Sequence, residues 1–223
     1  MALLAYVNSS MLGQFATQGL ISITYTLSAV LSLALVSIAP NIIRHVGNVK
    51  YMGGALLVSA ILLHLISNDS GVSIVPIFIV YFSLNSMVLY GLDLFLEHYS
   101  AESITGNIRG TYLTLGNIGW VAAPLITTLF QTSLGFSAIY TAAALAVMAT
   151  FLVIVFGQRG FVDRIYKKSH FIDGLHVLRK NKVLRRITLL NFMLQVNFVV
   201  MVIYSHVYLT SVIGFYWKTL GII

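Results

Sequence analysis

The sequence predicts an all-α polytopic membrane protein, and two observations lead to this fold class. Of the 223 residues, 58% are apolar and only 9% are charged, whereas a soluble domain carries about 25% charged residues. Apolar runs of about 20 residues, the length of a helix that crosses a bilayer, recur along the chain. Such runs do not suit the short alternating strands of a membrane barrel, and a helix satisfies its own backbone groups in lipid.

Six complete spans are predicted, each bounded by polar or glycine-containing breaks. They cover residues 19–39, 51–66, 74–96, 111–130, 136–156 and 187–210. An incomplete span precedes residue 9 and another begins at Trp217, and neither is long enough to cross a bilayer. We therefore expect the chain to be a fragment of a longer protein, and its first residues do not resemble a secretory signal.

A basic segment divides the chain into three parts. Nine of the thirteen Lys and Arg residues lie between residues 157 and 186. Residues 1–157 form the predicted N-terminal bundle with its truncated first span, residues 158–186 form a basic linker, and residues 187–223 contain the seventh span and the beginning of an eighth. We thus expect a six-helix bundle, a central loop and the start of a second bundle.

The linker is expected to contain a short amphipathic helix capped by Ser169. The apolar residues on one face of this helix are Phe171, Ile172, Leu175 and Leu178. With Arg179 and Lys180 near its end, such a helix favours an anionic membrane surface, where each basic residue contributes about 1 kcal/mol. A calmodulin-like or nucleic-acid partner is the less favoured interpretation.

The distribution of basic residues predicts the orientation of the spans. The breaks at residues 9–18, 67–73 and 131–135 contain no Lys or Arg, whereas the alternate breaks hold twelve of the thirteen basic residues. Only Lys218 falls on the opposite side. Because basic loops are retained in the cytoplasm, we expect a multi-pass protein of the cytoplasmic (plasma) membrane whose basic loops face the cytoplasm.

An internal repeat supports two bundles. Each copy closes a span with Ser-x-x-Gly and resumes at a later glycine, as Ser10, Gly13 and Gly19 do in the first copy and Ser211, Gly214 and Gly221 in the second. The offset is about two hundred residues. Parallel repeats of six spans joined by a central loop occur in major facilitator transporters, although small residues also coincide by chance.

Three fragments resemble the major facilitator superfamily, and with the spans they extend the resemblance over nearly the whole chain. After the second span, Gly47 and Lys50 match the family's basic motif, while Pro40 replaces its leading glycine and Arg44 stands where the acid belongs. The fourth span ends in acids, and an Arg-Gly loop follows. The fifth span is rich in glycine and proline. The remaining residues of these fragments are Asp93, Glu97, Arg109, Gly110, Gly116, Gly119 and Pro124.

This resemblance implies that five residues serve helix packing and bending: Gly47, Gly110, Gly116, Gly119 and Pro124. Asp93 and Glu97 are four residues apart and share a helical face. We expect them to form a cytoplasmic latch with Arg44 and Arg109, because acids at this depth pair with bases. The alternatives are that Glu97 is a solvated head-group residue and that Asp93 couples proton movement.

Polar side chains inside spans are costly in lipid, so they are candidates for a substrate cavity. They are Asn8, Tyr25, Asn85, Asn117, Trp120, Asn191, Gln195, Asn197 and Tyr204. The alternative for each of them is a hydrogen bond between helices, which contributes about 0.6 kcal/mol on average in membranes.

These patterns favour a secondary active transporter that moves a small solute, together with a coupling ion, by alternating access between two helical bundles. The chain has no phosphate-binding loop, no catalytic motif and no cysteine, so we expect neither an enzyme nor a cofactor. His98 with Glu102 supplies too few ligands for a metal site. The partners expected are the lipid bilayer and the solute, not nucleic acid. The alternative is a non-transporting relative, such as a sensor or assembly subunit, or an inactive fragment; alone, this chain is not expected to transport.

Overall fold

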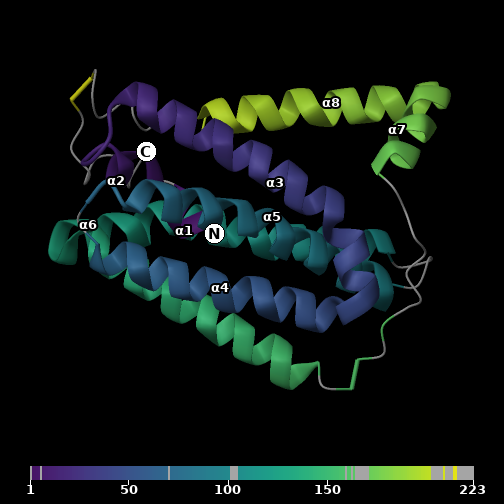
Figure 1. The fold of residues 1–223 in the computed structure, drawn as a ribbon, viewed down its shortest axis with the longest axis horizontal. Coiled ribbons are helices and arrows are strands. Elements are labelled where there is room, and N and C mark those ends of the chain that lie inside the picture. The colour runs from purple at the N-terminus through teal and green to yellow at the C-terminus, as the bar shows by residue number, and fades with distance from the viewer. Residues whose placement is uncertain are drawn as a thin grey trace.

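Helices account for all the regular secondary structure in the described part of the chain. The computed structural model describes residues 2–5, 7–69, 71–100, 105–158, 160–161, 163, 171–201, 208 and 213–214. The helices, drawn in Figure 1, are α1 (Ala2–Ala5), α2 (Asn8–Leu12), α3 (Gln18–Val46), α4 (Asn48–Asn68), α5 (Ile74–Tyr99), α6 (Thr105–Gly157), α7 (Phe171–Lys180) and α8 (Lys182–Val199). The predicted all-α class is confirmed.

Four described helices are long and apolar enough to cross a membrane. They are Gln18–Val46, Asn48–Asn68, Ile74–Tyr99 and Leu134–Gly157, and they cover the predicted spans at residues 19–39, 51–66, 74–96 and 136–156. This supports an integral membrane protein. The predicted span at residues 111–130 lies within α6, and α8 (Lys182–Val199) covers the first part of the span predicted at residues 187–210. That these two helices cross a membrane stays a prediction.

The second span is longer than its sequence predicts. Pro40 and the polar residues after it indicate a loop, but α3 continues through Pro40 to Val46. Proline removes only one helical hydrogen bond, which membrane helices tolerate because neighbouring groups satisfy the freed carbonyl. Gly47 is the single residue between α3 and α4, so the predicted loop between these spans is wrong except at this glycine.

Helix α6 consists of two arms that meet at a sharp bend. Gly135 has φ 78° and ψ −176°, a conformation that is essentially restricted to glycine. It lies at the end of the predicted break at residues 131–135. Pro124, in contrast, lies inside the first arm (residues 105–133). The chain therefore reverses direction at Gly135, and the second arm (Leu134–Gly157) returns beside α4, as Figure 1 shows.

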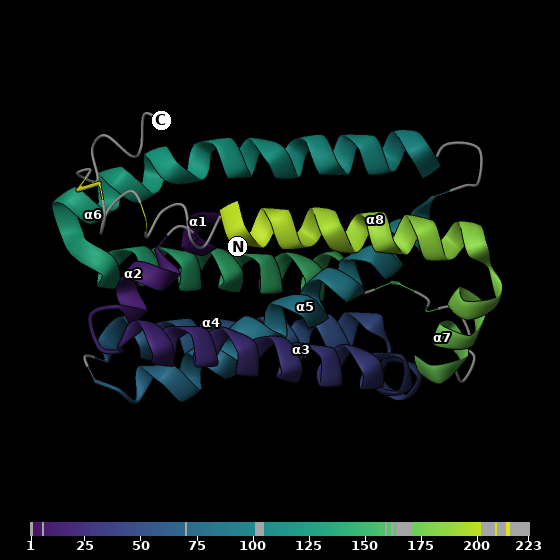
Figure 2. The ribbon, with the colours of Figure 1, turned by 90° about the horizontal axis from the view of Figure 1, so that it is seen from above.

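The core joins α4 to both the second arm of α6 and α5, while α3 packs mainly on α5. Two apolar clusters fill this unit. One lies around Phe78 and Tyr140 and includes residues of α1 and α2; the other lies around Met52 and Phe95 and includes the end of α3. The first arm of α6 lies along the edge opposite α3 and α4, with α8 beside it (Figure 2). Toward its end it contacts the core, since Phe130 packs on the first cluster and the buried Thr127 hydroxyl donates to the Leu3 carbonyl.

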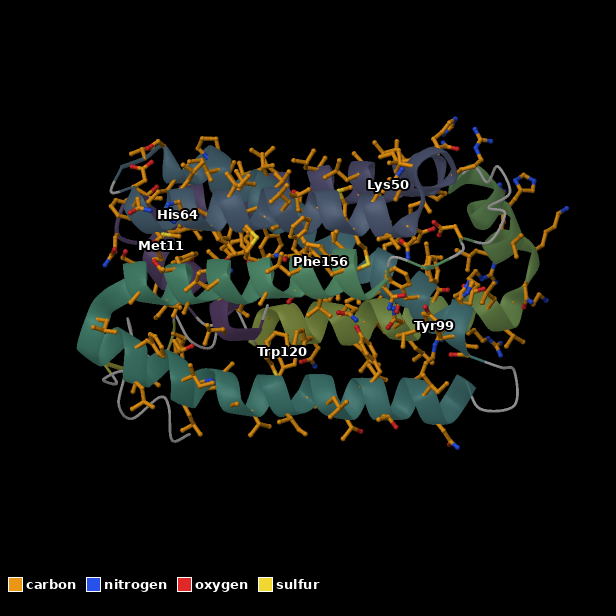
Figure 3. The ribbon with its side chains drawn as sticks, turned by 90° about the horizontal axis from the view of Figure 1, so that it is seen from below. Met11, Lys50, His64, Tyr99, Trp120 and Phe156 are labelled. Atoms are coloured by element: carbon orange, nitrogen blue, oxygen red, sulfur yellow. The ribbon has the colours of Figure 1, made fainter. Side chains whose placement is uncertain are left out.

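The two ends of the bundle differ in charge. The α3–α4 turn, the end of α5, the start of α6 and α7 lie together, and every described Lys and Arg belongs to these segments or to the first turns of α8. We call this the basic end. Figure 3 shows Lys50 and Tyr99 toward this end and Met11 and His64 toward the other. The described Lys and Arg residues thus gather at one end of the bundle, as predicted. That this end faces the cytoplasm stays a prediction.

Candidate functional site

The four residues of the expected latch all lie at the basic end. Arg44 is in the last turn of α3, Asp93 and Glu97 are near the end of α5, and Arg109 is near the start of α6. All four side chains are exposed, and within the described residues no ion pair joins them. The fold therefore gathers the predicted charges at one end without bringing them into contact, and the latch stays a prediction.

A carboxylate outside the expected latch makes a hydrogen-bonded contact at the basic end. The side chain of Asp163, in the linker, faces the first residue of α4: its Oδ2 and Oδ1 lie 3.0 and 3.2 Å from the backbone nitrogen of Asn48, which donates to both. The N–H groups of the first helical turn have no partner within their helix. Asp163 therefore caps α4 from a position 115 residues away in the chain.

Glycine at position 47 is required for this contact. Gly47 has φ 85° and ψ 157°, which side chains disfavour strongly. A Cβ added there would also lie 2.5 Å from Oδ2 of Asp163. Gly47 provides no side-chain cap for α4, although helix starts favour Ser, Thr, Asp or Asn. The linker carboxylate occupies the place that a capping side chain at Gly47 would take.

Asn48 also joins α4 to α5. Its side chain is fully buried, and its Nδ2 donates a hydrogen bond of 2.9 Å to the carbonyl of Gly91 on α5. The helices approach closely here, because a Cβ added at Gly91 would collide with Cγ of Met52. A single residue at the start of α4 thus contacts both the linker and α5.

Two further linker side chains contact the end of α5. The Phe161 ring lies 4.8 Å from that of Phe95 and 4.5 Å from that of His98, measured between centroids. The hydroxyl of Tyr99 donates a hydrogen bond of 2.8 Å to Oε1 of Gln158. We call Gln158, Phe161 and Asp163 the linker clasp, since all three contact the basic ends of α4 and α5.

The opposite end contains a separate polar cluster between α4 and the second arm of α6. Oγ of Ser67 lies 2.6 Å from Oγ1 of Thr141 and 2.9 Å from the carbonyl of Ser137. Oγ of Ser137 donates a bond of 2.7 Å to the carbonyl of Ser67. These reciprocal bonds fix the end of α4 to the start of the second arm, just after the bend at Gly135.

Two of the cavity candidates make contacts between helices in the core. Asn8 is only 4% exposed, and its Oδ1 accepts a hydrogen bond of 2.7 Å from the Tyr140 hydroxyl. The Tyr25 hydroxyl lies 3.1 Å from Oγ of Ser9, and its ring packs edge-on against that of Phe78. These bonds agree with the alternative of hydrogen bonding between helices, and the cavity role of both residues stays a prediction. Asn85, on α5, is half-buried.

The remaining described candidates lie on the first arm of α6 and on α8. Asn117, Asn191, Gln195 and Asn197 are exposed. Trp120 packs edge-on against Phe198 with 5.2 Å between ring centroids, and Figure 3 shows it between the first arm and α8. Tyr204 lies outside the described residues, as does Ser169 of the linker.

The Trp120–Phe198 contact shows which residues of the first arm of α6 and of α8 lie at the same level along the bundle. Both helices start at the basic end, so they run in the same direction (Figure 2). Asn117 precedes Trp120 by three residues and Gln195 precedes Phe198 by three residues. Each amide is therefore about one turn nearer the basic end than the ring contact, and the two exposed amides lie at similar depth.

Three of the glycines expected to serve helix packing contact no neighbouring element in the described structure. A Cβ added at Gly110, Gly116 or Gly119 would have no atom within 4 Å, and all three residues are exposed. Any packing role therefore requires a surface beyond the helices described, and this expectation stays a prediction.

The residues of the linker clasp, with their partners Asn48 and Gly91, were not identified from the sequence. No periodicity connects residues that are 59 to 115 positions apart, as the hydrogen-bonded partners of the clasp are. One signal was available: Gly47 stands before a predicted helix start and has no side chain with which to cap it, so the cap had to come from elsewhere.

Comparisons with known proteins give no relative. No family model, curated protein or solved structure matches the chain.

Proposed function

We propose that this chain belongs to a secondary active transporter of the major facilitator type, in which two helical bundles rock about a central site for a small solute. The observation that carries this proposal is the pair of exposed amides, Asn117 and Gln195, at similar depth on neighbouring helices. Amides facing lipid are costly, so they favour a water-filled or solute-lined surface.

The position of α8 supports a second bundle. Every described side chain from Lys182 to Phe198 is exposed, although most residues after Arg186 are apolar. In contrast, α3, α4, α5 and the second arm of α6 share a core. A helix with apolar and amide side chains that stays outside the first core is well suited to pack with further helices and to line the space between bundles.

The test uses the product of the complete coding region, reconstituted in liposomes with imposed proton and sodium gradients. We expect gradient-driven uptake of at least one solute from a panel of neutral and amphipathic compounds, because the spans contain few charges. Asn117→Leu and Gln195→Leu should each weaken the apparent affinity, whereas Asn107→Leu, on the same arm but nearer the basic end, should not.

The alternative is a non-transporting membrane protein of the same architecture, such as a sensor or assembly subunit. The departures at Pro40 and Arg44 from the family's motif favour it. If the correctly inserted complete product takes up none of the panel under either gradient, this alternative replaces the transporter proposal.

A further inference from the structure

We propose that the linker clasp is a conformational device that holds the beginning of the linker against the α3–α4 turn and the end of α5. Through it, a displacement of the linker is transmitted directly to the packing of the basic end. This inference rests on contacts within the chain and does not depend on transport.

The electrostatic part of the device is the carboxylate at the start of α4. A helix N-terminus carries a partial positive charge and favours an anion. Asp163 supplies that charge, and its two oxygens share the Asn48 amide proton. Because Gly47 supplies no side-chain cap, release of Asp163 would leave the first turn of α4 without this anion and this acceptor.

The apolar part is the Phe161 ring, which packs against Phe95 and His98 near the end of α5. Aromatic pairs of this kind contribute about 0.5–1.5 kcal/mol beyond the area they bury. The Tyr99–Gln158 bond adds a polar contact on the same helix. The clasp therefore contacts α4 through the Asp163 carboxylate, and it contacts α5 through the Phe161 ring and the Gln158 amide.

The three contacts also support one another, because they occur within a short stretch of chain, from Gln158 to Asp163. When one contact is formed, the others are held at high effective concentration. Asn48 then connects the two gripped helices, since it binds both Asp163 and the Gly91 carbonyl. The clasp is thus a linked arrangement in which release at one residue weakens the rest.

The absence of cysteine from the chain allows a direct test by spin labelling. Lys50→Cys and Gly160→Cys place labels at exposed positions on either side of the Asp163 contact. In the full chain in lipid nanodiscs, we expect one narrow distance distribution. Asp163→Ala should broaden it and add a longer distance, and Asp163→Asn, which keeps an acceptor but loses the charge, should do so less.

Amide exchange gives a second readout. The Asn48 amide should exchange about fivefold faster in Asp163→Ala, in line with the roughly 1 kcal/mol that helix caps contribute. Asp69→Ala is the matched control, because Asp69 also accepts from a backbone amide, that of Gly71 at 3.0 Å, but at the opposite end. It should leave both the label distance and Asn48 exchange unchanged.

A second label pair, His64→Cys with Leu134→Cys, reports on the opposite end. If Asp163→Ala broadens this pair as well, Asp163 is a general folding determinant and the proposal fails. It also fails if the Lys50–Gly160 distribution stays narrow in the double variant Asp163→Ala with Phe161→Ala. Broadening confined to the basic end supports the clasp.

Discussion

The hydroxyl of Tyr140 donates a hydrogen bond of 2.7 Å to Oδ1 of Asn8, and both side chains are almost completely buried. This bond joins α2 to the second arm of α6, which are separated by most of the chain. Asn8, a cavity candidate by sequence, therefore lies buried beside the apolar core, with its side-chain oxygen hydrogen-bonded.

Tyr140→Phe should therefore lower the free energy of unfolding by about 1 kcal/mol, because it leaves the Asn8 acceptor unpaired. Replacing both partners, with Asn8→Leu added, should cost less than the sum of the single changes. The measurement is reversible unfolding in mixed micelles with a double-mutant cycle. Strictly additive effects would show that the bond contributes nothing.

Because α4 and α5 approach closely at Gly91, replacing this glycine by alanine should change the free energy of unfolding differently from the same replacement at Gly54. Gly91→Ala forces Cβ against the buried Met52, and we expect a loss of about 1–3 kcal/mol. Gly54→Ala, on α4 with nothing within 4 Å, should be neutral or stabilising by up to about 1 kcal/mol because alanine favours helix. Thermal unfolding in detergent distinguishes them, and equal effects would contradict the packing described.

The corner between α7 and α8 should bind anionic phospholipid. Its exposed cations are Arg179, Lys180, Lys182, Arg185 and Arg186. Each contributes about 1 kcal/mol near an anionic surface, so Arg185→Gln with Arg186→Gln should reduce anionic lipid retained in native mass spectrometry by about fivefold for each cation. Arg44→Gln with Lys50→Gln removes the same charge elsewhere at the basic end. An equal loss in that control would argue for a general charge effect.

The latch can be tested by exchanging its charges. Arg44 and Asp93 are both exposed at the basic end, so pairing requires a conformation other than the one described. In the complete product, Arg44→Asp and Asp93→Arg should each reduce uptake about tenfold, and the double variant should restore most of it, since coupled residues give non-additive effects. Failure of the double variant to recover would remove the latch from the mechanism.

Much of the helical architecture follows from hydropathy and length. The predicted span at residues 74–96 became α5, Ile74–Tyr99, and that at 51–66 became α4, Asn48–Asn68. Both helices are predominantly apolar, so local composition largely determines their extent. The end of α3 was mispredicted because Pro40 is a strong local signal for a break, whereas the continuation of the helix depends on its surroundings.

The site was less predictable for a physical reason. Charged residues at span ends indicate which groups could pair, and Arg44 and Asp93 do lie at one end. The contact that forms instead uses a backbone amide and a linker carboxylate. Any acid in the linker could cap a helix equally well by sequence, so only the folded path of the chain selects Asp163.

Helix α4 is attached near both of its ends to the same stretch of chain. Ser67 binds the start of the second arm of α6, and Asn48 binds Asp163 just beyond the end of that arm. The attachments are separated by roughly 30 Å, the length of a helix of about 20 residues. Such a doubly anchored pair resists sliding of one helix along the other. A displacement of the linker at the basic end is therefore expected to shift the polar cluster around Ser67 at the opposite end.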